Sequence, residues 1–200
     1  MSVTINYETF AEKFAEHFSR LSIDFTNAIL HRFYIFAQYL LSENEKYNLT
    51  AITDIDDIII KHYLDSAAVL KYVDIPENSS VVDIGTGAGF PSVPLRIMRK
   101  DLNITYLDGS EKKINFINDA LNIIKETNKS NNTADMINTG EDIFYRGRAE
   151  DAGNNLYFRE KYDFAVSRAV AKLNVLCELA APLIKPGGYF IAYKSKNAAD

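Results

Sequence analysis

The sequence predicts an α/β fold: a mostly parallel sheet with helices on both faces, preceded by a helical lobe. Three observations support this prediction. Apolar residues recur at helical spacing through roughly the first seventy residues, short apolar runs alternate with helical patterns after residue 80, and a glycine-rich turn follows the first run. Proline and polar residues at 76–79 separate the two patterns, so we expect a helical lobe over 1–77 and a sheet-bearing core over 78–200.

The N-terminal lobe is expected to contain three helices, because its apolar residues recur every three or four positions. The first helix carries Phe10, Phe14, Phe18 and Leu21 on one face. Asp24 is expected to cap a second helix with aromatic residues through 25–40, and Asp54 a third helix through 55–72. We interpret these aromatic side chains as core rather than as a surface for stacking bases.

The C-terminal part alternates strand and helix patterns, which favours βαβ units and a parallel sheet. Strands are expected over 80–85, 103–109, 162–169 and 188–194, with a weak strand near 134–140. Helices are expected over 92–100, 112–125 and 173–184. The polar segment 126–135 is expected to be a surface loop, and 146–161 a loop with one helical turn.

The composition is that of an ordinary soluble protein, which we expect to be cytoplasmic. Apolar runs such as 58–60 fall far short of the roughly 20 residues that span a bilayer, and the first ten residues lack a signal-peptide pattern. The single cysteine, Cys177, lies in an apolar helical pattern and is expected to be a buried, inert thiol. His17, His31 and His62 are scattered without partners at ligand spacing, so no metal site is expected.

Charge is distributed unevenly along the chain. Residues 1–60 carry nine acidic and four basic residues, a net charge of −5, whereas residues 61–200 carry eighteen of each. A tight binder of naked nucleic acid usually presents a basic face, so the overall charge argues mildly against one, although local basic patches remain open.

Three glycines, Gly85, Gly87 and Gly89, directly follow the first predicted strand, which also carries Asp83. In an open parallel sheet, ligands bind beyond the carboxyl ends of the strands, where the first strand turns into its helix. Glycine adopts positive φ and lets a ligand approach the backbone. We therefore predict a cofactor site at this turn, rather than a tight connection with no ligand, and include Asp83 among its candidate residues.

The spacing of the turn distinguishes between cofactors. The dinucleotide fingerprint is G-x-G-x-x-G, but here Phe90 occupies the sixth position and the third glycine comes one place earlier, which favours S-adenosylmethionine over NAD. Asp108 ends the next predicted strand, where a carboxylate can accept hydrogen bonds from both hydroxyls of a ribose. Asp108 could instead cap the helix that begins near Glu111.

Several stretches resemble the RsmG (GidB) family of methyltransferases, in family order and over most of the chain from about residue 30. They are "YNLTAI" (47–52), "HYLDS" (62–66), "DIGTGAGFPSVPL" (83–95), "YLDGSEKK" (106–113), "GRAED" (147–151) and "SRAVAKLNVLCELAAPLIKPGGYFIAYK" (167–194). The resemblance implies a Class I, Rossmann-like methyltransferase that uses S-adenosylmethionine. It also implies that the substrate is N7 of a guanine in 16S ribosomal RNA, within the small subunit or a precursor of it.

The resemblance also implies roles for individual residues. Gly85 and Phe90 match positions that line the cofactor, Asp108 its ribose partner, Ala149 and Glu150 the pair beside the adenine, and Arg168 the arginine near the cofactor. His62 and Asp65 are three residues apart on a helix, and either link the lobe to the core or contact RNA. The same alternatives apply to Asn48 and Thr50, and Lys194 is among the basic residues available to phosphates.

The implied reaction requires no general base, because N7 of guanine presents a lone pair and no proton must leave before attack. The protein would hold sulfur, methyl and N7 in line within a dry pocket. We hypothesise that Arg168 orients the cofactor or the guanine, since a guanidinium can donate to guanine O6. The target guanine is expected in a loop or splayed out of a helix, and binding to isolated RNA is expected to be weak and salt-sensitive.

Three other functions stay open from the residues alone. One is a methyltransferase for a small molecule, with the helical lobe as a lid over its substrate. Another is an NAD-dependent oxidoreductase, and a third is a catalytically silent ribosome-assembly factor. The family core also has two strands after the one that 188–194 resembles, so we expect that strand to leave a bare sheet edge before the chain ends at Asp200.

Overall fold

A computed structural model describes residues 5–130 and 140–194 of the chain. The N-terminal helices are α1 (Tyr7–Arg20), α2 (Asn27–Tyr47), α3 (Ile55–Asp57), the π-helix η1 (Ile58–Leu64) and α4 (Asp65–Tyr72). They are followed by β1 (Ser80–Ile84), α5 (Ser92–Met98), β2 (Asn103–Asp108), α6 (Glu111–Ser130), β3 (Asp142–Arg146), α7 (Ala149–Asn154), β4 (Tyr162–Arg168), α8 (Leu173–Ala180) and β5 (Ile184–Tyr193). The α/β class and the mostly parallel sheet are confirmed.

The five described strands form one sheet in the order β3-β2-β1-β4-β5, and every pairing in it is parallel. From β1 the chain first adds β2 and β3 on one side, then crosses to add β4 and β5 on the other. This reversal places a topological switch point at the carboxyl end of β1, where open α/β sheets bind ligands.

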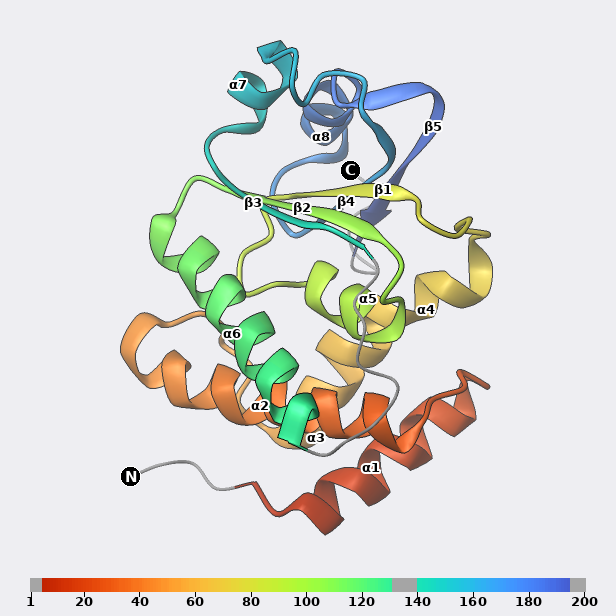
Figure 1. Cartoon of the computed structure of the whole chain (residues 1–200), viewed down its shortest axis with the longest axis vertical. Coiled ribbons are helices and arrows are strands. Elements are labelled where there is room, and N and C mark those ends of the chain that lie inside the picture. The colour runs from red at the N-terminus through yellow and green to blue at the C-terminus, as the bar shows by residue number, and fades with distance from the viewer. Residues whose placement is uncertain (1–4, 131–139, 195–200) are drawn as a thin grey trace.

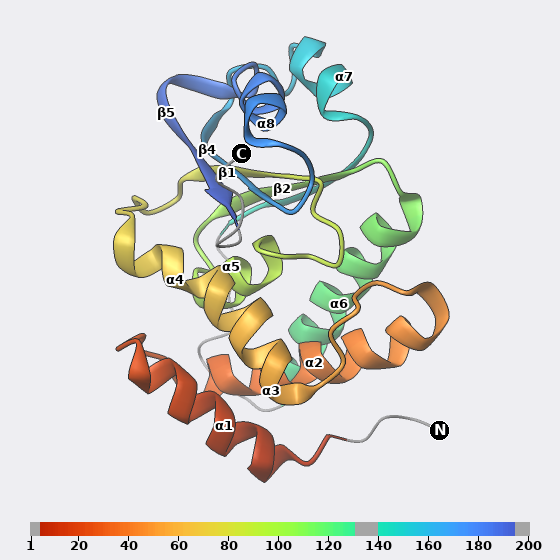
Figure 2. The same cartoon turned by 180° about the vertical axis from the view of Figure 1, so that it is seen from behind.

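Helices cover both faces of the sheet, as Figures 1 and 2 show, with α7 and α8 on one face and the remaining helices on the other. Side chains alternate along β1, so Val81 packs with the larger helical cluster and Val82 with the cluster under α7 and α8. The larger cluster is continuous from α1 to the sheet. The predicted division at residue 77 therefore stays a prediction about organisation, since one apolar core crosses it.

The aromatic residues of the N-terminal helices are core, as predicted. Phe10, Phe14, Phe18, Phe33 and Phe36 are all fully buried. Their rings stack or meet edge to face, with centroids of Phe14 and Phe18 3.9 Å apart. They are therefore not a surface for stacking bases.

One of the two predicted N-terminal caps is correct and the other is wrong. The Asp54 side chain accepts a hydrogen bond from Asp57 N at 3.1 Å, as expected for the cap of α3. The second helix is capped not by Asp24 but by Thr26, whose Oγ1 accepts from Ile29 N at 3.2 Å. A cap bonds the amide two or three residues ahead, so Asp24 lies too far upstream of the first turn.

Two further predictions need correction, and a third lies mostly outside the described residues. The surface loop predicted from residue 126 begins instead as helix, because α6 continues to Ser130; the rest of that loop, like most of the weak strand predicted near 134–140, lies outside the described residues. The strand observed there is β3, which starts later, at Asp142. Cys177 is exposed rather than buried, because α8 buries only Leu176 and Ala180.

Candidate functional site

The glycine turn after β1 makes two kinds of contact. Gly85, Gly87 and Gly89 all have positive φ, at 70°, 59° and 86°. A Cβ on Gly85 would come within 2.5 Å of Val170, and one on Gly89 within 2.5 Å of Val93, so these two glycines permit close packing. A Cβ on Gly87 would meet only the carbonyl oxygen of Gly85, at 3.8 Å. Gly87 is therefore the glycine that keeps space open rather than filled.

That space belongs to a cavity of about 650 Å³ at the carboxyl ends of β1, β2 and β4. Its volume lies within the usual range for small-molecule sites, roughly 300–1,000 Å³. Among the predicted site residues, the wall includes Gly85, Gly87, Phe90, Asp108, Ala149, Glu150, Arg168 and His62. Segments that are far apart in sequence thus meet at the switch point.

Asp108 joins the end of β2 to the glycine turn. Its Oδ2 accepts a hydrogen bond from Gly87 N at 3.0 Å, and its Oδ1 accepts one from Ser110 N at 2.8 Å. The side chain is nearly buried, and Lys113 Nζ lies 3.6 Å from Oδ2. A carboxylate has about four lone-pair positions, so Asp108 retains acceptor capacity for hydroxyl groups in the cavity. Its bond to Ser110, just before α6, fits the alternative role near the helix start equally well.

Asp83 lies behind the turn rather than on the cavity wall. The residue is completely buried, and neither carboxyl oxygen has a hydrogen-bond partner among the described residues. The nearby hydroxyls of Thr86 and Ser92 bond each other at 2.9 Å. Burial raises the pKa of Asp83 to about 6, although those hydroxyls act in the opposite direction. Burial without a close hydrogen-bond partner disfavours the charged form of the Asp83 carboxyl group.

Asp83→Asn is expected to become more stable relative to the wild type as pH rises from acid to neutral. The folded-state pKa of Asp83 lies above its ordinary value of 3.8, so its stabilising contribution is present below that value and is lost as pH rises through about 6. The difference in free energy of unfolding between variant and wild type should grow by up to about 3 kcal/mol between pH 4 and 7.5, as measured by urea unfolding.

Asp163→Asn is the matched control for that pH dependence. Burial acts to raise the pKa of Asp163, but hydrogen bonds from Lys185 and Ser80 outweigh it and lower the pKa to about 2. Its contribution is therefore lost only as pH falls below about 4, and its stability difference should stay constant between pH 5 and 7.5. If the stability difference between Asp83→Asn and wild type were also constant over this pH range, the raised pKa assigned to the buried Asp83 would be wrong.

The side chains of His62, Phe90 and Arg168 contact one another on the cavity wall. The His62 and Phe90 rings stack with centroids 4.2 Å apart, and the Arg168 guanidinium lies 4.9 Å from the Phe90 ring centroid. Nη2 of Arg168 is 3.0 Å from His62 Nδ1, and Nη1 donates to the Lys61 carbonyl at 2.9 Å and to Asp65 at 3.3 Å. Burial and then the charge of Arg168 lower the pKa of His62 to about 4. Arg168 thus ties β4 to the π-helix.

The contacts of Arg168 bear on the two alternatives for "HYLDS", a link between lobe and core or contact with RNA. His62 and Asp65 both contact Arg168, so the π-helix segment links the N-terminal helices to the sheet. His62 also lines the cavity, whereas Asp65 does not. The seven-residue π-helix is unusual, since such helices occur mostly as single turns and often at functional sites.

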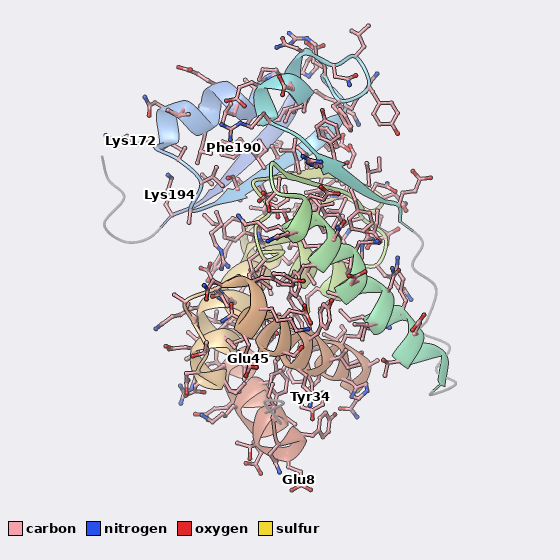
Figure 3. All side chains as sticks on the ribbon, turned by 90° about the vertical axis from the view of Figure 1, so that its left-hand side faces the viewer. Glu8, Tyr34, Glu45, Lys172, Phe190 and Lys194 are labelled. Carbon is pink, nitrogen blue, oxygen red and sulfur yellow. The ribbon has the colours of Figure 1, made fainter. Side chains whose placement is uncertain are left out.

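Gly89, Asn48 and Lys194 were also predicted as site residues and lie off the cavity wall. Asn48 is the exposed C-cap of α2, with φ of 49°, a left-handed conformation that asparagine tolerates. Lys194, labelled with Lys172 in Figure 3, donates from Nζ to the Ala171 carbonyl at 2.7 Å. Lys194 thereby holds the loop after β4, and Ala171 of that loop does line the cavity.

The sequence reading missed the apolar part of the wall. Leu49, Val170, Val175 and Leu179 line it together with Thr86. Val170 and Val175 are also exposed, which is consistent with a surface that faces the cavity. In the sequence these residues look like ordinary helix and loop positions, and only the meeting of α8 with the glycine turn reveals them.

The described residues contain neither a metal-ligand cluster nor a membrane-spanning helix. No group of three or more His, Cys, Asp or Glu residues is arranged to hold a metal ion within 5–130 and 140–194. Among the helices in those ranges, none has the length and apolar character needed to cross a membrane.

Comparisons with known proteins agree with this geometry. The family model described as GidB, rRNA small subunit methyltransferase G, matches residues 29–200. A protein named Ribosomal RNA small subunit methyltransferase G from Lachnoclostridium phytofermentans is 41% identical over 187 residues, which cover 94% of this chain and 72% of that protein. Its namesake from Caldanaerobacter subterraneus is 41% identical over 179 residues, covering 90% and 70%. A crystal structure of a Corynebacterium glutamicum protein matches with a TM-score of 0.51 at 13% identity, covering 94% of this chain and 74% of that one, and shows the same fold.

Proposed function

The chain belongs to the GidB family of rRNA small subunit methyltransferases, and on that premise we propose that it transfers a methyl group from S-adenosylmethionine to N7 of a guanine in 16S ribosomal RNA. The observation that carries the proposal is the cavity at the switch point, where Gly87 leaves the backbone bare beside the Asp108 carboxylate. Family membership agrees with the resemblance seen in the sequence.

The residues of the cavity suit this cofactor. The spare acceptor positions of Asp108 are suited to ribose hydroxyls, and Ala149 and Glu150 at the start of α7 lie on the same wall for the adenine. Gly87 admits a group close to the backbone. When bound, the cofactor supplies a methyl group on a positively charged sulfur, which is ready for direct transfer.

The chain's own task is then to position and to exclude water. Held by Asp108, Ala149 and Glu150, S-adenosylmethionine would supply the methyl group to N7; its sulfur would keep the electron pair of the broken bond and the purine would take up the positive charge. No proton moves, so no side chain need act as a base. The neutral His62, the Phe90 ring and Arg168 form the wall that orients the purine, and orientation of this kind can contribute about 7–11 kcal/mol.

We also propose a division of labour between the lobe 1–77 and the core 78–200. The lobe provides Thr50 and His62 to the cavity, and the core provides the cofactor residues. The RNA partner is proposed to be the small ribosomal subunit or a precursor, encountered in the cytoplasm. The net charge of −5 supports a shaped, protein-bearing substrate over naked RNA, because the chain offers no general excess of positive charge.

The proposal is tested by incubating the purified protein with tritiated S-adenosylmethionine and small ribosomal subunits that lack this modification. Digestion of the RNA to nucleosides should yield labelled 7-methylguanosine, and calorimetry should show binding of S-adenosylhomocysteine but not of NADH. Label on another nucleoside would contradict the N7 assignment. Label only on small molecules from a cell extract would favour the small-molecule alternative.

A further inference from the structure

Thr50 reaches the cavity from the loop between α2 and α3, and its hydroxyl oxygen is close to two nitrogen atoms. Ile52 N donates to Oγ1 at 3.0 Å. Nε2 of His62 lies 2.9 Å from the same oxygen. Which of the two groups donates in the second contact depends on the position of the proton on the imidazole ring.

Arg168 fixes that position. A guanidinium only donates, so His62 Nδ1, 3.0 Å from Arg168 Nη2, must accept and therefore carries no proton. Burial and the nearby positive charge keep the ring neutral at pH 7, because they lower its pKa to about 4. The single ring proton is consequently on Nε2, and Nε2 donates to Thr50.

The hydroxyl of Thr50 is left with one free function. A threonine oxygen has two lone pairs and one hydrogen, and here Ile52 N and His62 Nε2 engage both lone pairs. Over residues 5–130 and 140–194, no group accepts the hydroxyl hydrogen of Thr50. Because Thr50 lines the cavity, that hydrogen is available to a ligand there as a donor, and the oxygen has no remaining capacity to accept.

We propose that Thr50 donates this hydrogen to O6 of the target purine and thereby selects guanine over adenine. The inference deepens, and rests on, the proposed N7 methylation. In guanine, O6 is an acceptor next to N7, whereas adenine carries an amino group, a donor, in the same place. A hydroxyl that can only donate meets O6 favourably and opposes the adenine amino group. It also leaves the N7 lone pair free for the methyl group.

The proposal makes Arg168 and His62 positioning residues. Arg168 sets the tautomer of His62, His62 sets the direction of the Thr50 hydroxyl, and Thr50 makes the contact with the base. The earlier hypothesis that Arg168 itself donates to O6 becomes the competing assignment, since three of its N–H groups are directed to Lys61, Asp65 and His62.

The test compares two bases on the same variants. Small ribosomal subunits are reconstituted with 16S rRNA that carries either guanine or 2-aminopurine, which lacks O6 but keeps N7, at the position found to be methylated. Thr50→Val should lower the single-turnover kcat/KM for guanine by about tenfold or more, because it removes the donor. It should leave kcat/KM for 2-aminopurine unchanged. Thr50→Ser keeps the hydroxyl and should retain activity within about threefold on both bases.

Controls separate this role from a structural one. Thr53→Val, three residues away on an exposed position, should change neither rate, and calorimetry should give the same affinity for S-adenosylhomocysteine for all Thr50 variants. An equal fall of Thr50→Val on both bases, or no fall on guanine, would overturn the inference while leaving the methyltransferase function intact. A wild-type protein that forms no 7-methylguanosine would overturn the proposed function, and the inference with it.

Discussion

Gly87→Leu should abolish binding of S-adenosylhomocysteine while the protein remains folded. A Cβ at this position meets no side chain, so the added group would extend into the cavity rather than clash with the core. The cofactor cannot share that volume, and we expect affinity to fall at least about 100-fold by calorimetry, with loss of methyl transfer. The positive φ of 59° adds backbone strain of about 1–2 kcal/mol, which must be measured separately.

Gly187→Leu provides that measurement. Gly187 also has positive φ, at 86°, and nothing within 4 Å of its ideal Cβ, but it lies in β5 away from the cavity. Both variants should lose similar stability in urea unfolding, and only Gly87→Leu should lose the cofactor. If Gly87→Leu binds S-adenosylhomocysteine as tightly as Gly187→Leu does, the cofactor site is wrongly placed.

Arg168→Ala should reduce both stability and the rate of methyl transfer. Its side chain is only 16% exposed and contacts the Lys61 carbonyl, His62 and Asp65, so its loss leaves the Lys61 carbonyl and the buried His62 imidazole without this donor. We expect the free energy of unfolding to fall by about 2–4 kcal/mol. The single-turnover rate with saturating cofactor and ribosomal subunits should fall about 100-fold or more, because the wall that we propose to orient the purine loses the contacts that hold it together.

Two matched variants identify which Arg168 contacts matter. Asp65 is half exposed, so Asp65→Asn should lower stability by less than about 1 kcal/mol. Arg168→Lys keeps the positive charge but lacks the planar guanidinium that contacts several partners at once. Its rate of methyl transfer should therefore stay below that of the wild type. Equal effects of Arg168→Ala and Asp65→Asn would show that a surface ion pair is the main contribution. A full single-turnover rate for Arg168→Ala would refute its orienting role.

The sequence was sufficient for features that depend on local pattern. The phenylalanines on one face of α1, the strand β1 and the glycine turn after it each follow from a rule about neighbouring residues, and all were predicted.

Features that depend on distant contacts were not predictable. The edge strand β3 begins with Asp142, a residue that disfavours strands, and is held by the buried Arg96, whose Nε donates to Asp142 at 2.8 Å across 46 residues. Thr50 was named in the sequence as a residue that either links the lobe to the core or contacts RNA, but its contact with His62 has no local signal. Arg168 was predicted to lie near the glycine turn and does line the same cavity, but its bonds to the π-helix have no signal in the sequence.

During synthesis, α1–α4 leave the exit tunnel before the strands that complete their packing. Phe36 of α2 packs against Phe90 and Phe116, with ring centroids 5.5 and 6.3 Å apart. The face of α2 that carries Phe36 can therefore be covered fully only once residue 116 has been made, although α1, α2 and the π-helix can already pack on one another. Until then the nascent chain exposes aromatic surface that attracts chaperones or other chains, so slow translation through residues 80–120 should increase aggregation.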